Sequence, residues 1–358
     1  MTSKPHPDKA LLKRFLQQLS STSPRDRAAL AEAAYSDCIW KIFHPFNRLE
    51  GNHAAHDGFF AVLRTAMPDA EWRCAFMLAG EYEGRRMVSC MGHILGTFDA
   101  PLAGIPPTYG LAILRFGIHA TVRDGRMCVV HVLLDLVDLR HQAGVYPFRP
   151  MPGSPQQWPF PPCDSGATAL AVDPDLGADS LQIVHEMQMG LPKPAEIAAL
   201  SQQQGKHSHH WHEQMNWYGP AGIGSVRGLR GFRDFHGALF LQAFPDRTGF
   251  PRSQGWNEHH PGHHVRIGDG HFVVTGGWPS LHATHLGPEW LGLPPTGRKV
   301  EMRVADWYRL TNEGKIFDNW VLIDIPHIVH QMGLDLFHDL EFRTDPSRMR
   351  LPLASTQS

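Results

Sequence analysis

The chain has 358 residues, of which 42% are hydrophobic, and its formal net charge at pH 7 is −2. This length allows two ordinary globular domains, and the absence of a basic run argues against nucleic acid as a partner. The five cysteines are odd in number and lack CxxC spacing, which favours reduced thiols in a cytoplasmic protein. No apolar run reaches membrane-spanning length and the first residues are polar, so we expect neither a membrane partner nor a signal peptide.

The N-terminal region predicts two helices. Residues 9–20 place Leu11, Phe15 and Leu19 at helical spacing. Ser23-Pro24 suits a helix start, because Ser can cap a helix and Pro is favoured at its first position. We expect this second helix to run through residues 28–40. Residues 1–27 are interpreted as a helical arm that leads into the first domain.

Several segments of the chain occur twice in the same order. Asp135 to Gln142 matches Asp324 to Gln331, Ile105-Pro106-Pro107-Thr108 matches Leu293-Pro294-Pro295-Thr296, and Phe59 to Asp69 matches His236 to Asp246. Matches in one order at a nearly constant offset predict a tandem duplication. Each copy is expected to contain two helices, the second ending in a Pro-Asp turn, and then several strands. This is an α+β unit whose curved antiparallel sheet wraps around helices.

The duplication sets the expected domain boundaries. The first copy spans residues 28–148 and the second spans 205–342. Residues 149–204 are a Pro-rich linker with short helices at 178–189 and 194–203, and residues 343–358 are a loose tail. We expect the copies to form a pseudo-dimer within the chain, which could assemble further into a homo-oligomer.

The strand predicted at residues 300–310 carries the main chemical signal. Its alternation places Asp306 on the face formed by Met302, Val304, Tyr308 and Leu310, and a second strand, Ile316 to Ile323, follows a turn. Burial among apolar side chains would raise the pKa of Asp306 and make it a candidate general base. Alternatively, Asp306 is a structural carboxylate that an Arg or backbone donors satisfy. The equivalent face of the first copy has no acid, so the second copy is the expected active one.

Other polar residues are weighed against structural roles. Asp135 and Asp324 each precede a helix-like segment and are interpreted as N-caps rather than catalysts. His212, Asn216, Trp217 and Tyr218 are expected to end the first helix of the second copy and to line its pocket. Asn319 could hold a carbonyl or an enolate, or it could simply hydrogen-bond Asp306.

Two histidine-rich segments invite a metal hypothesis. If residues 207–213 were helical, His209, His212 and Glu213 would share a face and could bind zinc. However, no HExxH or comparable spacing completes the set. The second cluster, at residues 259–264, lies in a Gly/Pro-rich stretch that resembles a surface loop. We therefore expect no metal site, and a metal-dependent enzyme that uses residues 207–213 is a third, weaker hypothesis.

Motifs of the second copy resemble the SnoaL-like polyketide cyclases of the nuclear-transport-factor-two-like superfamily. They are Phe244-Pro245-Asp246, Ala283-Thr284-His285, Gly292-Leu-Pro-Pro-Thr-Gly297, Glu313-Gly314-Lys315-Ile316 and Gln331-Met332-Gly333. The resemblance implies a cone-shaped α+β fold around an apolar pocket and cofactor-free acid/base chemistry beside a carbonyl group. Family members often have His-Trp-Asp on the last strand, where this chain has Asn319-Trp320-Val321.

The sequence thus supports two hypotheses. The first is a cofactor-independent cyclase, isomerase or lyase that acts on a small apolar or carbonyl-containing molecule in the second domain. In it, Asp306 takes the proton, His285 or Tyr218 returns it, and His212, Asn216, Trp217, Asn319 and Trp320 bind the substrate. The second is a protein that binds a small molecule of this kind without converting it.

Overall fold

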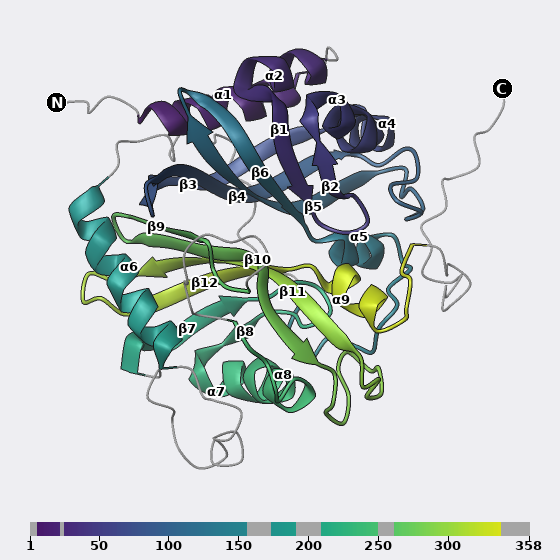
Figure 1. Cartoon of the computed structure of the whole chain (residues 1–358). Coiled ribbons are helices and arrows are strands. Elements are labelled where there is room, and N and C mark those ends of the chain that lie inside the picture. The colour runs from purple at the N-terminus through teal and green to yellow at the C-terminus, as the bar shows by residue number, and fades with distance from the viewer. Residues whose placement is uncertain (1–5, 22–24, 156–172, 191–208, 250–260, 338–358) are drawn as a thin grey trace.

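A computed structural model describes residues 6–21, 25–155, 173–190, 209–249 and 261–337 of the chain. These residues form two α+β units, each built on a six-stranded sheet. The sheets face each other in the middle of the molecule, and most helices lie on the outside (Figure 1). This arrangement confirms the predicted fold class of two fused α+β units. No helix within these ranges is long and apolar enough to cross a membrane.

The first unit runs from α1 to α5. Its helical segments are α1 (Pro7–Leu19), α2 (Asp26–Ala33), α3 (Gly51–Ala55), the π-helical turn η1 (His56–Phe60), α4 (Ala61–Ala66) and α5 (Leu136–Gln142). Its strands are β1 (Ala34–Ile42), β2 (Asn47–Glu50), β3 (Glu71–Tyr82), β4 (Arg85–Thr97), β5 (Leu111–Arg123) and β6 (Arg126–Leu134). The strand order is β2-β1-β6-β5-β4-β3, in which only β1 and β6 are parallel neighbours.

The second unit has the same arrangement. Its helical segments are α6 (Pro174–Met189), α7 (Gly228–Phe232), the π-helical turn η5 (Arg233–Gly237), α8 (Ala238–Ala243) and α9 (Ile325–Gln331). Its strands are β7 (Trp211–Tyr218), β8 (Val226–Arg227), β9 (Val265–Asp269), β10 (Phe272–Thr284), β11 (Lys299–Leu310) and β12 (Ile316–Ile323). The order β8-β7-β12-β11-β10-β9 repeats that of the first sheet, with β7 and β12 as the parallel pair. A tandem duplication would produce this correspondence, and the duplication itself stays a prediction.

Each sheet is covered on its outer side by helices in equivalent places. The first helix, α1, packs on β3 and β4, and α6 packs on the corresponding strands β9 and β10. The helical segment α3–η1–α4 lies against β1, as α7–η5–α8 lies against β7 (Figure 1). The arm helix and the linker helix of the sequence interpretation are therefore equivalent parts of the two units. The exact domain boundaries stay a prediction.

Two helix predictions are wrong in the same way. Residues 34–40, expected to be helical, belong to β1, and residues 211–218, expected to end a helix, form β7. In β1, Cys38, Trp40 and Ile42 are buried at a spacing of two residues. Pairing with the parallel strand β6 thus outweighs the helical preference of the alanines before it. The predicted helices at 9–20 and 178–189 and the strands at 300–310 and 316–323 are confirmed, whereas residues 194–203 lie outside the described ranges.

The two units meet through the inner faces of their sheets. Phe43, Leu78, Met87, Met91 and Leu133 of the first unit form one apolar cluster with Val274, Ala305, Trp307, Trp320 and Leu322 of the second. The Trp307 side chain is fully buried here, and its Nε1 donates a hydrogen bond to Ser89 Oγ at 2.9 Å. Inner strand residues that point towards the other unit are therefore unavailable to a pocket on the helical side.

A pair of reciprocal contacts joins the ends of the sheets. Asp135 caps α5 and Asp324 caps α9, which confirms the N-cap interpretation. Asp135 Oδ2 also accepts a hydrogen bond from Ala221 N at 2.9 Å, in the other unit, and Asp324 Oδ2 accepts one from His44 N at 3.0 Å. Each carboxylate also forms a buried ion pair at 3.1 Å, with Arg115 and Arg303 respectively.

Candidate active site

The alternation of β11 assigns its side chains to two different environments. Trp307 faces the first unit, whereas Asp306 and Tyr308 face the helices of the second unit. Thr275 of β10, Asp306 and Val321 of β12 are directly opposite one another across three strands, so their side chains share the helical side of the sheet. The prediction that Asp306 lies on the face of Met302 and Tyr308 is therefore confirmed.

Asp306 is an acid in a mostly apolar interior. Asn319 Nδ2 lies 3.4 Å from Asp306 Oδ1 and donates a hydrogen bond to the Trp307 carbonyl oxygen at 3.2 Å. Burial raises the pKa of Asp306 to about 7, and hydrogen bonds from Asn319 and Tyr308 offset part of this rise. Among the described residues, no lysine or arginine shifts the pKa of Asp306. The group can therefore both accept and release a proton near neutral pH.

Asp306 and its neighbour Val304 are only half-buried although they lie in the middle of a central strand. Both flanking strands are present, so their accessible surface faces the helical side rather than a sheet edge. We infer that there is space beside Asp306 inside the second unit.

A buried polar network lies beside Asp306. Gln188 Nε2, from α6, donates to Thr275 Oγ1 at 2.9 Å and to the Tyr308 hydroxyl at 3.3 Å. His263 Nδ1 lies 2.8 Å from the same Thr275 oxygen. Burial raises the pKa of Tyr308 well above its ordinary value, so its hydroxyl remains a donor. The network holds the wall of the site in one arrangement.

Sequence reasoning missed Gln188, Thr275 and His263 as members of this site. Gln188 belongs to a helix assigned to the linker, and the register that places Thr275 opposite Asp306 cannot be read from one strand. His263 was assigned to a surface loop, but it is 1% exposed and His264 is 6% exposed, which corrects that prediction. The only available signal was the alternation that put Tyr308 on the face of Asp306.

The first unit has apolar residues at all corresponding positions. By strand register, Ile118 corresponds to Asp306, Ala120 to Tyr308, Val130 to Asn319 and Cys90 to Thr275. All four are at most 1% exposed. Aromatic side chains fill this interior, where Trp40 packs edge-on against Phe60 with ring centroids 5.3 Å apart. The first unit therefore has a filled core where the second has polar groups.

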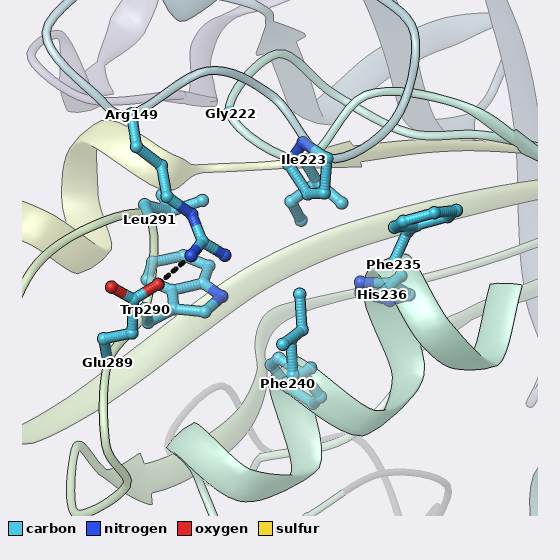
Figure 2. A pocket seen from close by; sticks show the side chains of 11 residues that line it. Arg149, Gly222, Ile223, Phe235, His236, Phe240, Glu289, Trp290 and Leu291 are labelled. Atoms are coloured by element: carbon cyan, nitrogen blue, oxygen red, sulfur yellow. Dashed lines mark ion pairs between the residues drawn. The ribbon is translucent and has the colours of Figure 1, made fainter. Parts of the chain in front are cut away.

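A narrow pocket opens on the helical side of the second unit (Figure 2). It is small, with room for about one water molecule, and is lined by aromatic side chains that include Phe235, His236, Phe240 and Trp290. An ion pair between Arg149 and Glu289 crosses one side of the pocket.

The pocket and Asp306 are linked through aromatic residues. His236 stacks on Trp217 with ring centroids 4.1 Å apart, and Trp217 is the strand neighbour of Asn319. Burial lowers the pKa of His236 to about 3, so its imidazole is neutral. His236 thus lines the pocket of Figure 2, and Trp217 connects it to Asn319 beside Asp306.

Tyr218 and Trp320 lie on the other side of the sheet. Their rings stack with centroids 5.4 Å apart, and Trp320 also packs on Phe76 of the first unit at 5.1 Å. The Tyr218 hydroxyl donates a hydrogen bond to Asp318 Oδ1 at 3.2 Å. Both residues contribute to the contact between the units, and the structure does not bring them to Asp306.

His285 lies beyond the far end of β10. Its backbone pairs with Arg298, eight residues before Asp306 in the chain, so it is about 25 Å from Asp306 along the sheet. The imidazole is fully buried, with Phe244 at a centroid distance of 5.5 Å and Thr296 Oγ1 3.4 Å from its Nδ1. The predicted pairing of His285 with Asp306 is thus not present in this structure.

Asn216 lies on the same side of β7 as Tyr218, and His212 lies near the start of the strand. The His212 ring contacts Phe317 at 5.0 Å, and Asn216 Nδ2 donates to Asp318 Oδ1 at 3.0 Å. Since β7 is a strand, His212 and Glu213 do not share a face as the zinc hypothesis requires. Residues 207–208 and 259–260 of the histidine-rich segments lie outside the described residues. Of the predicted site residues, the structure brings Asp306, Asn319 and Trp217 together.

Residues 266–332 match the model of the SnoaL-like polyketide cyclase family. This segment includes β10, β11, β12 and α9 and contains Asp306 and Asn319. The resemblance noted in the sequence is therefore confirmed for the second unit. A search of curated protein sequences found no significant match.

Solved structures of similar proteins each match about one unit of the chain. A SnoaL-like protein from Jannaschia sp. CCS1 is 19% identical over 38% of this chain and 90% of its own, with a TM-score of 0.31. IdmH from Streptomyces antibioticus, proposed to be a polyketide cyclase, is 15% identical over 37% of this chain and 94% of its own, with a TM-score of 0.30. AclR from Streptomyces galilaeus, proposed to be a hydroxylase, is 19% identical over 44% and 82%, with a TM-score of 0.30.

Proposed function

We propose that this chain, whose second unit contains a SnoaL-like segment, is a cofactor-independent acid/base enzyme of the cyclase, isomerase or lyase type. Its substrate is a small, largely apolar molecule with a carbonyl group, and Asp306 is the proton-transfer group. The observation that carries the proposal is the half-buried Asp306 carboxyl, with a pKa raised to about 7, at the position where the first unit has Ile118.

The position of Asp306 supports this role. Val321 stands where SnoaL-like cyclases often have an aspartate, and Asp306 is its direct neighbour on β11. The two positions share the helical side of the sheet, so a carboxyl on β11 reaches the region that one at position 321 would reach. The acid missing from β12 is replaced by one on the adjacent strand.

The proposed reaction needs only this chain's own side chains. The Asp306 carboxylate removes a proton from the carbon next to the carbonyl, and the electrons of that C–H bond move into an enolate. Asn319 Nδ2 and the Tyr308 hydroxyl are the nearby donors that stabilise the enolate oxygen. The protonated Asp306 then returns its proton to another carbon in an isomerisation, or to the new alkoxide oxygen after ring closure.

The test measures proton removal without knowledge of the natural substrate. A panel of aromatic ketones and 1,3-diketones is incubated with the protein in D2O, and exchange of the hydrogens next to the carbonyl is followed by NMR. Asp306→Asn should reduce exchange by about 100-fold or more, whereas Asp234→Asn, at an exposed carboxyl on η5, should leave it unchanged. Exchange by Asp306→Asn at the wild-type rate would refute the proposal.

Non-catalytic binding of a similar ligand is the second candidate function. The tight stacking of Trp217 on His236, between the pocket of Figure 2 and Asn319, favours it. Wild-type protein that binds members of the panel by calorimetry but exchanges none of their hydrogens would support this candidate.

A further inference from the structure

We propose that His44, His330 and Asp335 form a binding site for a divalent transition-metal ion such as Zn²⁺ at the junction of the two units. The three side chains offer two imidazole nitrogens and a carboxylate oxygen that lie within 4.8 Å of one another. This set of ligands suits zinc, with the fourth position left to water. This proposal does not depend on the role proposed for Asp306.

The fold brings the three residues together from both units. His44 follows β1, and its backbone N–H donates to Asp324 Oδ2 at 3.0 Å, which fixes this loop beside the start of α9. His330 lies in the last turn of α9. Its ring stacks on the His44 ring with centroids 4.7 Å apart.

The end of α9 returns the chain towards His330. Leu334 N donates to the Val329 carbonyl oxygen and Gly333 N donates to that of His330, with Gly333 at φ +98°. This is the Schellman pattern, in which a glycine with positive φ reverses the chain after a helix. The turn places Asp335 Oδ2 3.8 Å from His330 Nδ1, while Asp335 Oδ1 accepts a hydrogen bond from Phe337 N at 2.9 Å. The carboxylate is thereby oriented towards the imidazole.

The geometry needs little adjustment to hold an ion. Zinc–nitrogen and zinc–oxygen bonds of about 2.0–2.1 Å require ligand atoms about 3.4 Å apart in a tetrahedral site. His330 is exposed and can rotate towards the half-buried His44.

The equivalent junction, where Asp135 accepts from Ala221 N, lacks these three ligand residues. There, Ala221 corresponds to His44, since each donates its backbone N–H to the capping aspartate of the opposite unit. His141 corresponds to His330, and Tyr146, eleven residues after its capping aspartate, corresponds to Asp335. The three ligands thus meet only at one of the two equivalent junctions, and His141 provides a matched control.

An ion at this site would connect the units. Its ligands come from the loop after β1 in the first unit and from α9 and the following turn in the second. We therefore expect the ion to stabilise the folded chain against unfolding, because the unfolded chain does not hold the three ligands together.

The experiment uses full-length protein freed of metal with EDTA and then dialysed. Zn²⁺ binding is measured by calorimetry, Co²⁺ binding by its visible absorption, and the melting temperature with and without Zn²⁺. Wild type should bind one ion at this site, and a Zn²⁺ concentration about 100-fold above Kd should raise the Tm by about 5 °C. His330→Ala and Asp335→Asn should each weaken binding at least about tenfold, because loss of even an outer partner of a metal ligand commonly costs that much.

His141→Ala separates this site from general binding by the chain's histidines. Both His141 and His330 are exposed and lie in the last turn of a helix, so neither substitution should prevent folding. His141→Ala should bind Zn²⁺ as wild type does. Absence of binding to wild type, or equal binding by wild type and His330→Ala, would overturn the proposal. So would an equal loss in His141→Ala and His330→Ala, which would show adventitious binding only.

Discussion

Asp306 on β11 and Val321 on β12 are directly opposite each other in the second sheet, and both side chains point to its helical side. In the first unit, the same two positions are occupied by Ile118 and Val132, whose side chains are buried in a filled core. A half-buried acid with polar neighbours therefore distinguishes the second half of the chain from the first, and it affects both stability and reactivity.

The stability of the protein should depend on pH through Asp306. Burial raises the pKa of its carboxyl to about 7 in the folded state, against about 3.9 in an unfolded chain. The folded protein thus binds this proton more tightly, and the resulting stabilisation is complete below about pH 4 and lost as the pH rises through 7. The free energy of unfolding of wild type relative to Asp306→Asn should fall by at most about 2–3 kcal/mol between pH 5 and pH 8. Urea titrations at both pH values measure it, and a pH-independent difference would contradict the raised pKa.

Tyr218→Phe should leave proton exchange almost unchanged. The Tyr218 hydroxyl binds Asp318 on the side of the sheet that faces the first unit, away from Asp306. Loss of a general acid would cost about 100-fold or more in rate, whereas we expect a change of less than about twofold. The D2O exchange assay measures this effect beside Asp306→Asn. A large loss in Tyr218→Phe would restore the role that the sequence suggested for it.

Asp324→Ala should destabilise the protein more than Asp324→Asn. Alanine removes the buried carboxylate that pairs with Arg303, which keeps only the half-buried Glu301 as an ionic partner, and it also removes the cap of α9. Such losses cost about 3–5 kcal/mol. Asparagine loses the ion pair but can still cap the helix and accept from His44 N. The free energies of unfolding in urea compare the two variants. Equal values would show that capping and the bond to His44 contribute little.

Gly117→Ala should weaken the contact between the units. A Cβ at Gly117 would lie 2.3 Å from Cη2 of Trp307, whose ring is fully buried between the sheets. Overpacking of this kind costs about 1–3 kcal/mol. Gly110→Ala is the control, because its Cβ would meet nothing closer than 3.9 Å. A Gly117→Ala protein with the wild-type Tm would contradict the packing described for Trp307.

The strands around Asp306 could be predicted from the sequence because their alternation is strict. Residues 300–310 and 316–323 carry this pattern, and the glycine-containing turn between them leaves little choice of pairing. The side of the sheet that Asp306 occupies followed from the same alternation. The N-cap roles of Asp135 and Asp324 followed from their recurrence before two helix-like segments.

The rest of the site depends on contacts between distant segments. β7 has no alternation strong enough to exclude a helix, and it becomes a strand because β12 and β8 pair with it. Tyr218 and Trp217 are adjacent in the chain but lie on opposite sides of the sheet once that pairing is fixed. Gln188 reaches Thr275 only because α6 lies across β9 and β10.

Through the two capping aspartates, each half of the protein stabilises a loop of the other half. Since Asp135 holds the backbone at Ala221 and Asp324 holds the backbone at His44, each half supplies the acceptor that keeps a loop of the other in place. A chain cleaved between α5 and α6 should therefore remain a non-covalent heterodimer under native conditions. Made separately, the first fragment would expose the apolar surface around Met91 and the second would expose that around Trp307. Each fragment should therefore aggregate when its counterpart is absent.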